Sequence, residues 1–248
     1  MRYKVTGSIL MILGTALGAG MLALPVVSSQ QTFLITALML VTTWFLMTAG
    51  AFALLEVNLW FPSGSNLVSM AKGTLGKSGK VLVWVVYLAL LYCLICSYLS
   101  GAGDVLSGLL ASVNLILPLW VCDCLALLIL GSIVVIGMSS VDRANRVLMF
   151  FKILAYLFVV IMIMPNVQLS HLVRHSDSWH WSVLTVMATS FGFAIIVPSL
   201  RSYLGAEQAQ LNKILLIGSC IPLIIYLLWS FVVQGVLRHS ALQTILHS

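Results

Sequence analysis

Residues 14–25 read GTALGAGMLALP and lie inside the apolar run that opens the chain. Three glycines and a proline in twelve residues are unfavourable for a continuous helix, because glycine costs conformational entropy and proline lacks an N–H donor. Gly14 and Gly18 have the spacing at which small residues let two membrane helices approach closely. This packing explanation leaves Gly20 and Pro25 without a role. We therefore favour a second explanation, in which the helix unwinds between Gly18 and Gly20 and the irregular backbone is buried or lines a cavity.

The composition indicates an integral membrane protein. Of the 248 residues, 61% are hydrophobic and 7% are charged, whereas a soluble domain carries roughly a quarter charged residues. We treat the first apolar run as a retained helix, because it lacks the small-residue cleavage site of a signal peptide. With about 20 apolar residues needed per crossing, the sequence predicts an all-helical bundle of seven spans. Their approximate ranges are 5–27, 33–58, 80–111, 119–138, 147–165, 181–200 and 212–236.

Lysine and arginine predict that the N-terminus is cytoplasmic. With this orientation ten of them fall on the inner side and two, Arg174 and Arg238, on the outer side, as the positive-inside rule requires. The net charge of +6 is then explained by topology and by attraction to anionic membrane lipid, and it calls for no nucleic-acid partner. The inner residues are Arg2, Lys4, Lys72, Lys77, Lys80, Arg143, Arg146, Lys152, Arg201 and Lys213.

The reactive side chains form no pattern that indicates catalysis, a metal or a cofactor. The five cysteines lie in or beside apolar runs, where cysteine packs as a small apolar residue. His171 and His175 have i,i+4 spacing in an outer connector, and His180 follows; a metal site is one interpretation, but we expect these histidines to be solvated. The spans carry no Ser–His or paired-aspartate arrangement. We therefore expect no enzymatic activity.

A second stretch repeats the pattern of the first. TSFGFAIIVPSL, residues 189–200, places Gly192 between two phenylalanines and Pro198 six residues further on. It lies in the sixth predicted span, so it crosses the membrane in the direction opposite to the first span. Interrupted helices at matching places in oppositely oriented repeats indicate the midplane site of a secondary transporter.

Two such interruptions suit a zwitterionic solute. The N-terminal end of a half-helix offers N–H groups and a positive partial charge to a carboxylate, and the C-terminal end of another offers carbonyls to an ammonium group. One amino acid meets both demands. Phe191 and Phe193 either line an aromatic side-chain pocket or are ordinary phenylalanines of a membrane helix, and the sequence leaves both interpretations open.

Several segments together resemble the bacterial tyrosine- and tryptophan-specific permeases of the hydroxy and aromatic amino acid permease family. They are GTALGAGMLALP, LLEVNLWFP, SGAGDVLSG, VDRANR, and SFGFAIIVPSL followed by GSCIPLIIYLLWSFVVQG. The resemblance implies a multi-pass protein of the bacterial inner membrane that imports an aromatic amino acid, most closely tyrosine, together with a proton. It also implies the five-plus-five inverted-repeat fold of the amino acid, polyamine and organocation superfamily.

In that fold the first and sixth helices hold the backbone of the substrate. The resemblance implies that N–H groups over residues 19–21 bind the carboxylate and that carbonyls near Leu17 and Phe191 receive the ammonium group. Tyr98 is included because the third helix supplies substrate contacts in this fold. The predicted binding residues are Leu17, Gly18, Ala19, Gly20, Met21, Tyr98, Phe191, Gly192 and Phe193.

The chain is shorter than members of the family. We expect one transmembrane domain over residues 1–248, with a first repeat at about 5–165 and a partial second repeat at about 181–236. The last helices of the second repeat would be missing. We therefore expect a truncated gene product with a separately encoded C-terminal part as a partner. The alternative to transport is a non-transporting remnant or a membrane interaction scaffold.

Three ionisable residues are candidates for proton coupling, because a charge within the membrane is costly and usually functional. Lys152 lies about five residues into the fifth span, where some proton-coupled members of the superfamily place a lysine at the position of a sodium ion; the alternative is that it reaches the cytoplasmic interface. Asp104 follows small residues that would let the third span pack tightly and turn the carboxylate inward. Glu56 closes the second span and is either a coupling residue or an interfacial carboxylate.

Overall fold

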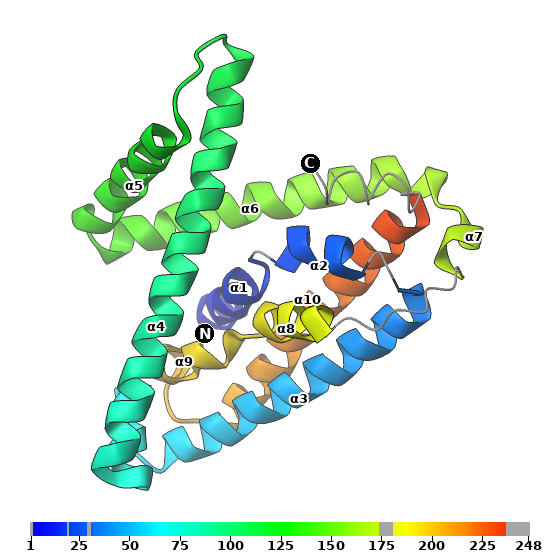
Figure 1. The fold of residues 1–248 in the computed structure, drawn as a ribbon. Helices are drawn as coiled ribbons and strands as arrows, with labels where there is room; N and C mark the ends of the chain where they lie inside the picture. Colours follow the sequence, from blue (N-terminus) through cyan, green and yellow to red (C-terminus); the bar gives the residue numbers. More distant parts are fainter. Residues whose placement is uncertain (1, 19, 29–30, 174–180, 237–248) are drawn as a thin grey trace. The chain divides into compact units, whose positions relative to one another are not determined.

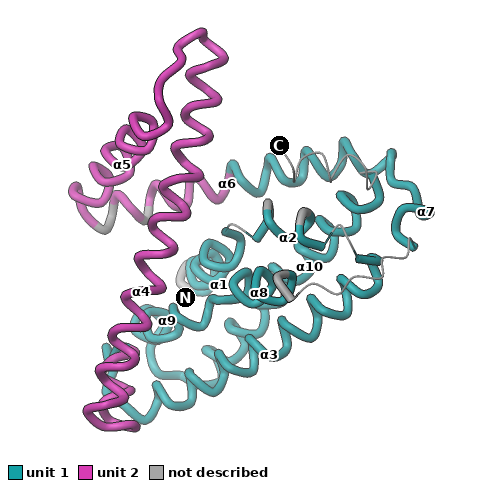
Figure 2. Tube along the Cα trace, viewed as in Figure 1, with its two compact units in different colours: residues 1–66, 151–248 teal, residues 67–150 magenta. Residues whose placement is uncertain are grey.

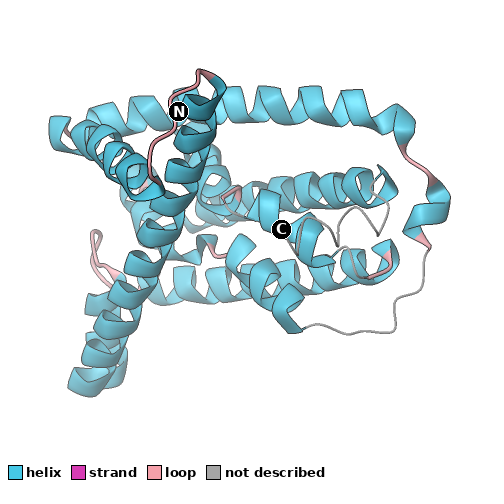
Figure 3. Ribbon diagram, turned by 45° about the horizontal axis from the view of Figure 1, so that its top comes forward, coloured by secondary structure: helices cyan, strands magenta, loops and turns pink. Residues whose placement is uncertain are grey.

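A computed structural model describes residues 2–18, 20–28, 31–173 and 181–236. Every regular element in this part of the chain is a helix (Figure 3). The helices form two compact units, one of residues 1–66 and 151–248 and the other of residues 67–150 (Figure 2). Each unit is described by itself below.

The first unit holds most of the helices (Figure 1). They are α1 (Arg2–Ala16), α2 (Gly20–Ser28), α3 (Phe33–Leu59), the last part of α6 (Met138–Ile163), η1 (Met164–Asn166), α7 (Leu169–Leu172), α8 (Trp181–Ser190), η2 (Phe193–Ile196), α9 (Val197–Leu204) and α10 (Gln208–Val236). The second unit contains α4 (Leu67–Ser112), α5 (Leu119–Ile136) and the first part of α6.

The prediction of a multi-pass helical membrane protein is confirmed at this level. Among the described residues, six segments are long and apolar enough to cross a membrane. The first predicted span is not one of them, because it is divided between α1 and α2 and its apolar first part covers only Val5–Ala16. The count of seven spans and the cytoplasmic N-terminus stay predictions.

The helix α10 is the central element of the first unit. It packs against α1, α2 and α3. Its contact with α1 is close at Gly218, where a Cβ atom would lie 3.2 Å from the Cβ of Ile12. Trp44 of α3 donates its Nε1–H to the main-chain carbonyl of Ser219 at 3.0 Å. Both contacts are possible because Gly218 and Ser219 are small, so that Ile12 and Trp44 can reach the main chain of α10.

The two interrupted spans lie side by side in antiparallel orientation. The first half of one, α1, packs against η2 and α9, whereas its second half, α2, packs against α8. Each half therefore lies beside the opposite half of the other span, and the two interruptions come to the same level, since a Cβ atom at Gly20 would lie 2.8 Å from the Cβ of Ser190. The opposite directions predicted for these segments are confirmed, and the complete inverted-repeat fold stays a prediction.

In the second unit α4 and α5 pack against each other as a helical hairpin. Within α4, Gly76 has a non-helical backbone with φ 73° and ψ −160°, so the apolar part of the helix follows a kink. Gly103 is buried at the contact, where a Cβ atom would lie 3.2 Å from the Cα of Asp123 on α5. Asp104 is exposed. Within this unit, the carboxylate that lies against Gly103 is that of Asp123, which the sequence analysis missed, and not that of Asp104.

Replacing Gly103 by leucine should separate α4 from α5, because the larger side chain would overlap with Asp123. Overpacking of this kind costs about 1–3 kcal/mol. Gly101→Leu is the matched control, since nothing lies within 4 Å of a Cβ atom at Gly101 on the same helix. Thermal unfolding in detergent measures both variants. Equal stability of the two would contradict the close contact at Gly103.

Candidate functional site

The first interruption separates α1 from α2. Helix α1 ends at Ala16 and α2 begins at Gly20. Gly18 donates its N–H to the carbonyl of Ala16 at 2.9 Å, two residues back instead of four. Ala19, predicted to bind a carboxylate, lies outside the described residues. The predicted unwinding between Gly18 and Gly20 is confirmed.

The second interruption separates α8 from η2 and α9. Helix α8 ends at Ser190, and the N–H of Gly192 then bonds to the carbonyl of Thr189 at 3.1 Å. The chain resumes as a 3-10 turn at Phe193 before α9. Pro198 is the second residue of α9, where its missing N–H costs little. This interruption also lies where the sequence predicts it.

The main chain at Gly20, in the first interruption, lies close to Ser190, at the second interruption. Gly20, the first residue of α2, is buried. A Cβ atom there would lie 2.8 Å from the Cβ of Ser190, the last residue of α8, and 2.7 Å from the hydroxyl of Tyr226 on α10. Glycine is therefore required at this position for packing. The space beside Gly20 is filled by protein side chains, which the sequence analysis did not anticipate.

Tyr226 connects α10 to both interruptions. Its hydroxyl donates to the carbonyl of Ala16, the last residue of α1, at 2.5 Å. Its ring packs edge-on against the ring of Phe191, with centroids 5.5 Å apart and an interplanar angle of 86°. Tyr226 and Phe191 are both fully buried. The carbonyl end of α1 thus receives a side-chain donor from another helix.

Further along α10, two more side chains donate to α2. Pro25 has no N–H for the carbonyl of Met21, four residues earlier, and Trp229 donates its Nε1–H to that carbonyl at 2.6 Å. The amide of Gln234 donates to the carbonyl of Ser28, where α2 ends, at 3.1 Å. One helix therefore holds both halves of the first interrupted span through main-chain carbonyls.

Residues 1–248 match the tryptophan/tyrosine permease family. The chain belongs to this family.

Three relatives illustrate the range of the family. Tyrosine-specific transport system 2 of Haemophilus influenzae is 34% identical, over 100% of this chain and 62% of its own length. Glutamine transporter 2 of Aliivibrio fischeri is 31% identical, over 95% and 62% respectively. A tryptophan-specific transport protein of Haemophilus influenzae is 31% identical, over 94% and 59%. The chain thus spans about three fifths of the length of these relatives, all of which are named for transport. No solved structure matches it.

The structure brings together most of the residues that the sequence analysis predicts to bind a substrate. Leu17 is buried at the end of α1, and Phe193 is fully buried where η2 begins. Met21 is partly buried against a cluster that contains Tyr156 of α6. Tyr98 lies on α4 in the second unit and is exposed, so its relation to the interruptions stays a prediction.

The three candidates for proton coupling lie in different surroundings. Lys152 is half-buried on α6, one helical turn before Tyr156, whose hydroxyl donates to the carbonyl of Ile225 on α10 at 3.2 Å. Residues four apart share a helix face, so Lys152 lies on the face of α6 that meets α10. Glu56 on α3 and Asp104 on α4 are exposed. The coupling role of all three stays a prediction.

Arg201 was counted only as an inner-side charge, but it is 6% exposed. Its Nη1 donates to the main-chain carbonyl of Asn58 and to that of Phe61 at 2.9 Å. These carbonyls lie at the end of α3, where a helix leaves acceptors unpaired and carries a negative partial charge. Arg201 therefore ties α9 to α3. The sequence contains one indication of this burial. Arg201 is four residues after Val197 and therefore lies on the same face of α9, which is buried.

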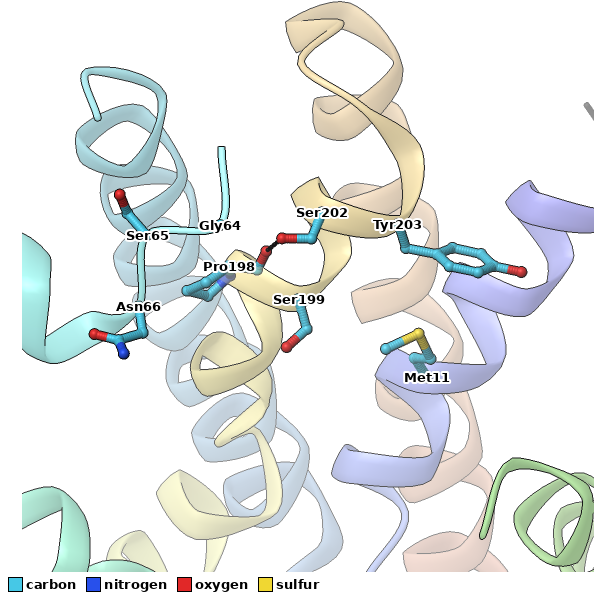
Figure 4. Close-up of a pocket in the computed structure, with 8 residues that line it drawn as sticks. All are labelled: Met11, Gly64, Ser65, Asn66, Pro198, Ser199, Ser202 and Tyr203. Carbon is cyan, nitrogen blue, oxygen red and sulfur yellow. Dashed lines mark hydrogen bonds between the residues drawn. The ribbon is translucent and has the colours of Figure 1, made fainter. Parts of the chain in front are cut away.

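A cavity of about 420 Å³ lies between α1, α9 and the loop after α3 (Figure 4). Most of its lining side chains are small or polar, and Ser202 donates its hydroxyl to the carbonyl of Pro198 at 3.0 Å. The lining residues are Met11, Gly64, Ser65, Asn66, Pro198, Ser199, Ser202 and Tyr203. The cavity therefore adjoins the first half of one interrupted span and the second half of the other.

Gly20→Ala should lower the thermal stability of the protein, because the new methyl group would overlap with Ser190 and the Tyr226 hydroxyl. The expected loss is about 1–3 kcal/mol of unfolding free energy. Gly50→Ala on α3 is the control, since nothing lies within 4 Å of a Cβ atom there, and it should be neutral or stabilising by up to about 1 kcal/mol. If Gly20→Ala were as stable as Gly50→Ala, the close approach of α2 to α8 would be wrong.

Proposed function

We propose that this chain acts in the proton-coupled import of an aromatic amino acid, most closely tyrosine, across the bacterial inner membrane. The observation that carries the proposal is the pair of interrupted spans, which run antiparallel with their interruptions at the same level. Interrupted helices in opposite orientations are the arrangement in which secondary transporters build their substrate sites. The full inverted-repeat fold is part of this proposal.

Each interruption exposes main-chain groups that suit one end of an amino acid. The first turn of α2, from Gly20, carries the positive end of a helix dipole, which suits a carboxylate; the N–H of Met21 bonds to the carbonyl of Gly18 at 3.4 Å and would have to exchange it for the carboxylate. The end of α1, at Ala16 and Leu17, offers carbonyl groups to an ammonium group, and Phe191 borders the same place. Main-chain groups of this kind would bind the carboxylate and the ammonium group, which all amino acids have. The aromatic preference must come from side chains around them.

The relatives support the substrate class but leave a range within it. Two are named for tyrosine or tryptophan and one for glutamine. The identity with the tyrosine-specific protein, 34%, is slightly higher than the 31% with each of the others. We therefore propose tyrosine as the first substrate to test, with tryptophan, phenylalanine and glutamine as competitors.

The charge distribution supports a cytoplasmic N-terminus. In this orientation α1 and α9 form the cytoplasmic halves of the two interrupted spans, and the cavity between them opens on the cytoplasmic side of the interruptions. Ser65, Ser199 and Ser202 contribute hydroxyl groups to a lining that is otherwise largely apolar. The cavity thus becomes the inner part of the proposed transport route.

Uptake by the purified chain in liposomes tests the proposal directly. We expect saturable uptake of labelled tyrosine that is driven by an inward proton gradient and collapses with a protonophore. Unlabelled tyrosine and tryptophan should compete. Uptake no greater than into protein-free liposomes would contradict transport by this chain and would favour a scaffold role.

Lys152→Ala tests the coupling role of the half-buried lysine. We expect the variant to bind tyrosine but to lose the stimulation of uptake by a proton gradient, because it removes the cation that lies one helical turn from Tyr156. Lys213→Ala, which changes an exposed lysine on α10, is the control and should keep that stimulation. Unchanged stimulation in Lys152→Ala would assign coupling to another residue.

A further inference from the structure

We propose that the hydroxyl of Tyr226 competes with the ammonium group of the substrate for the carbonyl oxygen of Ala16. Tyr226 is then a positioning residue of the binding site, and its hydroxyl must leave this carbonyl when an amino acid binds. The inference rests on the proposed function, because it assigns a partner to the ammonium group of the transported amino acid.

The hydrogen bonds at Ala16 supply the first argument. A carbonyl oxygen has two lone pairs and accepts two good hydrogen bonds. At Ala16 both are used, one by the N–H of Gly18 at 2.9 Å and the other by the hydroxyl of Tyr226 at 2.5 Å. An ammonium group can therefore bind to this oxygen only if one of these donors leaves. The N–H of Gly18 belongs to the turn that ends α1, so the side-chain donor is the one that can be exchanged.

The position of the hydroxyl supplies the second argument. It lies beside the carbonyl end of α1, and a Cβ atom at Gly20, where α2 begins, would be only 2.7 Å from it. The hydroxyl thus occupies the gap between the carbonyl end of one half-helix and the N–H end of the next. This gap is where the two charged groups of an amino acid would bind.

The surroundings of Tyr226 distinguish it from the other donors of α10. Trp229 and Gln234 donate to carbonyls of α2, at Met21 and Ser28. Tyr226 alone among these three donates to α1, and its ring contacts Phe191 at the second interruption. Loss of the Tyr226 bond would therefore free a carbonyl of α1 while α2 stays attached to α10.

The experiment compares two ligands on wild-type protein and on Tyr226→Phe. The ligands are L-tyrosine and 3-(4-hydroxyphenyl)propionate, which has the same carboxylate and phenol but no ammonium group. Dissociation constants are measured by equilibrium binding to the purified full chain in detergent. Tyr226→Phe removes the competing hydroxyl and keeps the ring that packs against Phe191. We expect tyrosine to bind about fivefold more tightly, as loss of one competing hydrogen bond allows, with the propionate unchanged.

Two further variants keep the test decisive. Trp229→Phe removes a donor of α10 that does not contact Ala16, and it should shift the two ligands by the same factor. If Tyr226→Phe does not fold, Tyr226→Leu also lacks the hydroxyl and should show the same selective gain for tyrosine. A merely structural role for Tyr226 would change both ligands equally.

The outcomes separate this inference from the proposed function. Tyrosine binding by wild-type protein with no selective gain in either Tyr226 variant would overturn the inference and leave the proposed function intact. Tyrosine binding that is seen only in a Tyr226 variant would support the inference. Absence of tyrosine binding in wild-type protein and in both variants would overturn the proposed function together with the inference.

Discussion

The structure depends on how the main-chain polar groups at the two interruptions are satisfied. Within a bilayer no water is available to these groups, so each helix end at membrane depth needs a partner from the protein. In the first interrupted span that partner is α10, which donates to carbonyls of Ala16, Met21 and Ser28. The carbonyl groups of the first interrupted span that lose their helical donors thus find donors on a third helix, α10.

This arrangement gives α10 a mechanical role in any movement of the interrupted span. Two of its donors attach to α2 and one attaches to α1. A change in which α1 moves and α2 stays would break the hydrogen bond from Tyr226, at a cost of about 0.5–1.5 kcal/mol, and would also disturb the packing of Ile12 against Gly218. In the proposed function, an amino acid bound at Ala16 would replace this hydrogen bond. Binding and movement of α1 would then be linked through one carbonyl.

The sequence predicted both interruptions because glycine and proline constrain the backbone locally. Each of Gly20, Gly192, Pro25 and Pro198 changes the backbone hydrogen bonding of its own neighbours in the chain. Their effect on the helix can therefore be predicted without knowing which distant residues pack against them. The sequence could not predict which side chain fills the space beside Gly20, since Tyr226 is more than 200 residues away in the chain. Charge counting likewise assigned Arg201 to topology, because a count does not distinguish a buried guanidinium from an exposed one. The sequence could have predicted that the carbonyl of Met21 needs a donor from elsewhere, since a proline leaves the carbonyl four residues earlier without its usual donor. It could not have predicted that the donor is Trp229.

The link from Arg201 to α3 also decides which residues of this chain are constrained by the contact. Its guanidinium binds chiefly to carbonyl oxygens, which every residue type possesses, so the identity of Phe61 is not read by the contact. Substitutions can accumulate at that position without loss of the link as long as the helix still ends there. The contact therefore constrains Arg201 and, through its side-chain oxygen, Asn58, but not the residue type at position 61.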